Sequence, residues 1–87
     1  MFNFSANRIN IISTKNYDKC NVYIGIDLDT KRCYKIYDYS KSAIISIGKV
    51  YCISGKINSA DKLYLILENF KEDKKYNQYK IINVQKA

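Results

Sequence analysis

The stretch "GKVYCISGKINSADKLYLILENF", residues 48–70, holds two apolar bursts separated by a polar turn. The second burst, "KLYLILENF" (62–70), matches helical spacing and strand alternation equally well. Its length of about eight apolar residues is short for an amphipathic helix and ordinary for a strand. As a helix it would also leave the bulky side chains of Tyr64 and Leu65 on the solvent-exposed side. In addition, "NSAD" (58–61) has the usual length of a hairpin turn. We therefore predict a hairpin, and with it a small β-barrel in place of an α+β domain.

The clearest strand signal outside this stretch is "NVYIGIDLD", residues 21–29. Aliphatic side chains alternate along it with tyrosine, glycine and aspartate, which is the period-two pattern of a half-buried strand. We expect Val22, Ile24 and Ile26 to face the core and Tyr23 to face solvent.

A hairpin is predicted to follow, with "DTKR" (29–32) as the connection and "CYKIYDY" (33–39) as the returning strand. On the returning strand, Ile36 is expected to join the aliphatic inner face. Lys35 and Tyr37 then face solvent.

Short strands are predicted at residues 8–13, 49–57 and 78–84, and Gly55 marks a bulge or a sharp bend. Residues 40–49 are compatible with one turn of helix or with a bulged strand.

Eighty-seven residues make a single domain, 1–87, with residues 1–7 and 85–87 expected to be loosely ordered. The predicted fold class is mainly all-β: a small antiparallel barrel of five to six strands with little helix. Closing these strands into a barrel would leave no edge strand with unpaired backbone groups.

The charge is strongly basic, with 15 Lys and Arg against 8 Asp and Glu and a net charge of +7. Such a balance in a small domain favours polyanions or anionic membranes as partners. Codon bias in an AT-rich genome is a rival explanation for the abundance of lysine and tyrosine.

Several classes of function are disfavoured. The chain has no histidine, three glycines and no phosphate-binding or nucleophile motif, so no enzyme, catalytic residue or cofactor is expected. Three widely spaced cysteines and no secretory signal indicate reduced thiols, no zinc site and a cytoplasmic location. Asp27 and Asp29 have a spacing that could hold a metal, but they flank a predicted turn, where aspartate is common. No apolar run reaches the roughly 18 residues of a membrane span.

Lysines and tyrosines interleave on the predicted solvent faces. Lysine neutralises phosphates, and a tyrosine ring offers a platform for base stacking worth about 1–3 kcal/mol. Tyrosine also favours strands for packing reasons alone. Few arginines imply little base-specific readout.

The quoted stretch resembles the strand–turn–strand of an oligonucleotide-binding (OB) fold, and the length, charge and strand-face aromatics resemble small single-stranded-DNA-binding proteins of phages and plasmids. The resemblance spans residues 20–84, but lacks a clear helix between the third and fourth strands and has no tryptophan or phenylalanine platform. It implies a nucleic-acid site with stacking residues Tyr23, Tyr37, Tyr51 and Tyr64 and phosphate-holding residues Lys31, Arg32, Lys35 and Lys56.

Two hypotheses about function follow. The first is a non-enzymatic protein that binds single-stranded nucleic acid with little sequence preference. DNA is favoured over RNA as the ligand, and the protein is expected to form a homodimer. The alternative is a small phage- or mobile-element-encoded module that inhibits or regulates a host protein through exposed tyrosines. No basic amphipathic helix supports a membrane contact.

Overall fold

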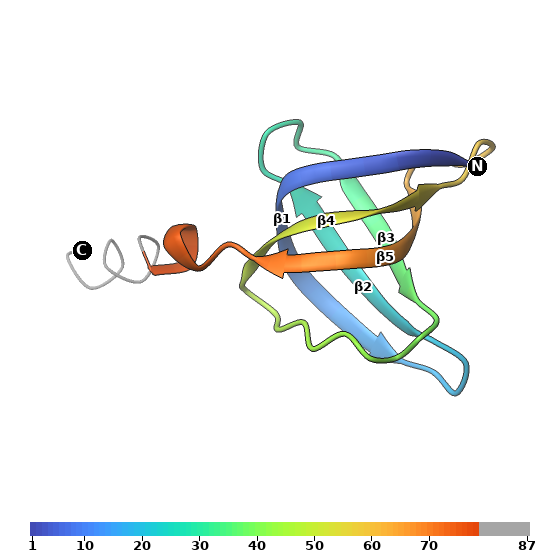
Figure 1. Cartoon of the computed structure of the whole chain (residues 1–87), viewed down its shortest axis with the longest axis horizontal. Helices are drawn as coiled ribbons and strands as arrows, with labels where there is room; N and C mark the ends of the chain where they lie inside the picture. Colours follow the sequence, from blue (N-terminus) through green and yellow to red (C-terminus); the bar gives the residue numbers. More distant parts are fainter. Residues whose placement is uncertain (79–87) are drawn as a thin grey trace.

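The computed structural model describes residues 1–78, and within them the strands close into a barrel (Figure 1). A short helical turn begins at Lys74, beyond the end of the last strand. The prediction of a small, mainly all-β barrel with little helix is confirmed. The strands are β1 (Phe2–Asn16), β2 (Asn21–Asp27), β3 (Cys33–Asp38), β4 (Val50–Ile57) and β5 (Tyr64–Glu72).

The strand order round the barrel is β1-β2-β3-β5-β4, and β4 pairs again with β1. Four of the neighbouring pairs are antiparallel, but β3 and β5 are parallel. The expectation of a purely antiparallel barrel is therefore wrong for this pair. The cause is the long β3–β4 connection, which carries β4 to β1 and leaves the place beside β3 for β5. Closure leaves no free sheet edge among these strands.

The ambiguous burst in the quoted stretch is a strand, as predicted. β5 forms a hairpin with β4 and buries Leu65 completely, while Leu67 packs against the core. The register between the two strands shifts between Ser54 and Gly55, so the predicted bulge at Gly55 is confirmed. The bulge bends the hairpin, as barrel closure requires.

β1 is longer than predicted. It begins at Phe2, and the segment from Phe2 to Ala6 pairs with β4, although residues 1–7 were expected to be loosely ordered. The second half of the strand pairs with β2. Register shifts after Ala6 and after Ile11 allow this one strand to bend and serve both neighbours.

The inner face of β2 is the opposite of the one predicted. Tyr23 pairs with Ile36 and lies inside the barrel with it, so the aliphatic side chains of β2 point outward and are half-buried. The reason is space: a side chain at Gly25 would meet Ile9 and Ile36 in the narrow centre of the barrel. A one-residue change of phase exchanges the two faces of a strand.

The β3–β4 connection, residues 39–49, forms neither the helical turn nor the bulged strand considered from the sequence. It packs onto the core through Ile45. The buried carboxylate of Asp38 accepts hydrogen bonds from the Ser40 hydroxyl (2.6 Å) and the Ala43 N–H (3.1 Å), which fixes the start of this connection.

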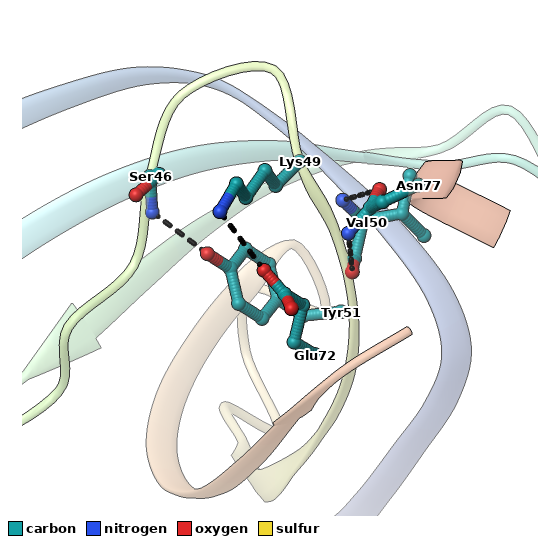
Figure 2. A network of polar contacts seen from close by, with 6 residues as sticks. All are labelled: Ser46, Lys49, Val50, Tyr51, Glu72 and Asn77. Atoms are coloured by element: carbon teal, nitrogen blue, oxygen red, sulfur yellow. Dashed lines mark hydrogen bonds and ion pairs between the residues drawn. The ribbon is translucent and has the colours of Figure 1, made fainter. Parts of the chain in front are cut away.

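The helical turn is attached to the start of β4. The Asn77 amide accepts a hydrogen bond from the Val50 N–H (2.9 Å) and donates one to the Val50 carbonyl (3.3 Å) (Figure 2). Asp73 caps the turn by accepting the Tyr76 N–H (3.0 Å). The predicted strand at 78–84 lies outside the described residues apart from Gln78, which is helical, and residues 85–87 lie outside them entirely.

Candidate nucleic-acid interface

A groove of about 370 Å³ crosses the outer faces of β1, β2 and β3. Two cross-strand rows build it: Ser13, Ile24 and Lys35 lie side by side in one, and Lys15, Val22 and Tyr37 in the next. Tyr17 and Cys20, next to the β1–β2 turn, complete its lining.

The groove combines apolar surface with positive charge. β2 contributes two half-buried aliphatic side chains, Val22 and Ile24, where an outward strand face is usually polar. The exposed Lys15 and Lys35 flank them, and none of the residues that line the groove is acidic. The Lys15 ammonium also lies 5.8 Å from the centre of the Tyr17 ring. An apolar strip between two cations suits a ligand with flat rings and a charged backbone.

Three tyrosines gather beside the groove, Tyr37 on β3, Tyr39 directly after β3 and Tyr64 on β5, and we refer to them as the tyrosine cluster. The Tyr37 and Tyr64 rings stack with centroids 4.1 Å apart and planes 18° apart. The Tyr39 ring lies 6.2 Å from that of Tyr37 at an angle of 16°, and the Tyr39 and Tyr64 hydroxyls are 2.9 Å apart. These contacts hold the rings nearly parallel, as a preformed platform.

The pKa of Tyr64 in this cluster is raised above its ordinary value. The hydrogen bond to Tyr39, together with partial burial, raises the pKa of Tyr64 to about 12. A phenol with the ordinary pKa of about 10 is already neutral at physiological pH, and the raised pKa keeps the Tyr64 phenol neutral to still higher pH, so it does not repel a phosphate.

Four of the predicted site residues share this outer surface. Lys35 pairs with Tyr64, and Tyr37, Ile66 and Lys56 form the next row across β3, β5 and β4. Lys56 donates a hydrogen bond to the Asn3 side chain. With strands about 4.8 Å apart, Lys56 lies roughly 10 Å from Tyr37.

Lys31 and Arg32 are exposed in the β2–β3 turn, and neither lines the groove. Lys31 has a left-handed backbone, with φ of 65°. These two cations lie in the turn of the β2–β3 hairpin, outside both the groove and the tyrosine cluster.

Tyr23 and Tyr51 are not stacking residues, and this part of the prediction is wrong. Their exposures are only 4% and 3%, because both lie inside the barrel. The Tyr23 hydroxyl donates to the Ala43 carbonyl (3.4 Å), and the Tyr51 hydroxyl accepts the Ser46 N–H (2.8 Å; Figure 2). Burial raises the pKa of Tyr23 above its ordinary value. Both tyrosines anchor the β3–β4 connection.

We expect Tyr51→Phe to lower the free energy of unfolding by about 1 kcal/mol, because a buried hydrogen bond to the Ser46 N–H is lost while the ring remains. Affinity for oligonucleotides should not change. Urea unfolding and an oligonucleotide titration measure the two quantities. A large loss of oligonucleotide affinity with an unchanged free energy of unfolding would mean that Tyr51 contacts the ligand after all.

Sequence reasoning missed Lys15, Tyr17 and Tyr39. Lys15 lies near the end of β1, beyond the strand predicted at residues 8–13, and Tyr17 directly follows β1 in the connection to β2. Tyr39 could have been found, since residues two apart share a strand face and Tyr37 was already placed outward.

Asp27 and Asp29 flank the β2–β3 turn as predicted, and the Asp27 carboxylate bonds to its backbone. The Asp27 Oδ1 accepts the N–H groups of Asp29 (2.8 Å) and Thr30 (3.3 Å). In the described part of the chain, no group of three or more His, Cys, Asp or Glu side chains could hold a metal ion. Within residues 1–78, no helix is long and apolar enough to cross a bilayer.

Comparisons with protein-family models, curated proteins and solved structures return no match for this chain.

Proposed function

We propose that the protein binds single-stranded nucleic acid, with DNA favoured over RNA as the ligand, and that it does not catalyse a reaction. The observation that carries the proposal is the continuity of the groove with the tyrosine cluster: Tyr37 lines the groove and stacks on Tyr64. Bases are expected to stack on the rings and the aliphatic strip, and Lys15 and Lys35 to neutralise phosphates.

The architecture supports the proposal by analogy. Five-stranded OB barrels bind oligonucleotides on the face of their second and third strands and through the adjacent loops. The groove described above occupies the same strands. A platform made of stacked rings, with no arginine in the groove lining, implies little base-specific readout.

The test is a gel-shift titration of oligo-dT and oligo-U at rising salt. Affinity should fall as salt rises, because bound lysines release counterions. The double variant Lys15→Gln/Lys35→Gln should reduce the salt slope by about 1.4, at about 0.7 per phosphate contact on a single strand.

The matched control is Lys15→Arg/Lys35→Arg, which keeps both charges and should keep the slope. Absent binding, or binding indifferent to salt, would overturn the proposal. A slope unchanged in the glutamine variant would remove these two lysines from the site.

A second candidate function is inhibition or regulation of a host protein. The observation that favours it is in the β3–β4 connection, where Ile44 and Ile47 are 84% and 57% exposed. Contiguous exposed apolar surface marks protein contacts, and these two side chains are three residues apart in one connection. Capture of a host protein after nuclease treatment, abolished by Ile44→Ser, would favour this function. The homodimer and the phage or plasmid origin stay predictions.

A further inference from the structure

A second basic surface lies at the other end of β5, away from the groove. It comprises Lys71, Lys74 and Lys75, all exposed, and we refer to these three residues as the distal lysines. They line a depression of about 560 Å³ together with Cys52, Glu72 and Asp73. Lys71 and Cys52 are cross-strand partners, and because Tyr51 and Ile53 on either side of Cys52 are buried, both partners face outward.

The two acids in this depression have partners other than the distal lysines. The Glu72 carboxylate pairs with the Lys49 ammonium at 3.1 Å, which raises the pKa of Lys49 (Figure 2). Asp73 accepts the Tyr76 N–H as the cap of the helical turn. Among residues 1–78, no acid forms an ion pair with any of the distal lysines. Their positive charge is therefore open to an external anion.

The distal lysines are connected to the groove by the outer face of β5. Tyr64 belongs to the tyrosine cluster, and Ile66 lies between Tyr37 and Lys56 in one row. Lys71 follows Ile66 by five residues on the same strand, which is about 16 Å at 3.3 Å per residue. The exposed Glu68 and Asn69 lie between them on β5, so a strand of nucleic acid that leaves the cluster along β5 passes one acidic side chain before it reaches these cations.

We propose that the distal lysines form a second phosphate-binding site, which holds the continuation of the same nucleic-acid strand that occupies the groove. This inference rests on the proposed function and adds the length and direction of the bound segment. Only a ligand long enough to reach along β5 contacts the second site.

The test compares two lengths of oligo-dT, about 6 and about 16 nucleotides, within the range of about 4–16 nucleotides for small barrels. The variant Lys71→Gln/Lys74→Gln/Lys75→Gln should weaken binding of the long oligonucleotide and reduce its salt slope by about 2, at about 0.7 per lysine. The short oligonucleotide should bind as tightly as it binds the wild type. The control Lys71→Arg/Lys74→Arg/Lys75→Arg keeps the charge and should restore the long-oligonucleotide slope.

The outcomes separate the two proposals. If the wild-type protein binds neither length, the proposed function is overturned, and the second site with it. If the wild type binds both lengths and the glutamine variant weakens neither, or weakens both equally, only the second site is overturned. A thermal melt of each variant verifies that the barrel is folded.

Discussion

Replacing Tyr37 by alanine is expected to weaken oligo-dT binding by about 5- to 150-fold, which corresponds to about 1–3 kcal/mol for one stacked base. The ring lines the groove and is supported by Tyr64 at 4.1 Å, so its loss removes both a stacking surface and the neighbour that orients the second ring. The salt slope should not change, because no phosphate contact is lost. Fluorescence titrations at several salt concentrations measure both quantities.

Tyr37→Phe is the matched control, since it keeps the ring and removes only the hydroxyl. It should bind close to the wild type. Tyr64→Ala should also weaken binding, and the double alanine variant should lose less than the sum of the two, because the rings act as a pair. Wild-type affinity in Tyr37→Ala, with the variant folded, would contradict base stacking at the tyrosine cluster.

The fold class was predictable because local signals agreed. The length of the burst at 62–70 and the turn before it both favoured a strand, and β5 is that strand. The bulge at Gly55 was predictable for a similar reason, since glycine within a strand pattern signals a bend. The parallel pairing of β3 with β5 was not, because it depends on where β4 closes the barrel.

The candidate site was predictable only in part, and the failure has one main cause. Alternation shows that a strand has two faces but not which one is inside. Hydrophobicity alone predicts that the aliphatic residues of β2 face inward. In the narrow barrel, however, the position next to Ile9 has room only for a glycine, so Gly25 faces inward, and Tyr23 lies on the same face of the strand. The same inversion turns Val22 and Ile24 outward, where they are half-buried and form the apolar strip of the groove.

Tyr51 illustrates a second limit. A strand that is apolar on both faces, such as β4, gives no internal signal of which tyrosine is exposed. Its orientation is set by contacts distant in sequence, including Phe70, whose ring lies 6.2 Å away.

The largest effect on stability is expected for Gly55→Ala, at about 3 kcal/mol or more, the upper end of the cost of overpacking. A Cβ at Gly55 would overlap the Ile66 carbonyl oxygen and lie 3.1 Å from the Glu68 nitrogen. Both atoms belong to the backbone of β5, which cannot rotate away as a side chain can. Urea unfolding followed by circular dichroism measures the change.

Gly25→Ala is the informative comparison. Its Cβ would meet side chains of Ile9, Ile36 and Ile11, which can shift within the core, so the expected cost is smaller, about 1–3 kcal/mol. Equal or reversed costs would contradict the distinction between backbone and side-chain overlap.

Gly55→Ala also links the fold to the site. To accept a methyl group, β5 must move away from β4 or change register, and β5 carries Tyr64 to its stacking position against Tyr37. If the variant folds, we therefore expect weaker oligo-dT binding although Gly55 contacts no ligand in the proposed site. Gly25→Ala leaves the β4–β5 pairing intact and should bind more tightly than Gly55→Ala. The opposite order would mean that the tyrosine cluster does not depend on the bulge.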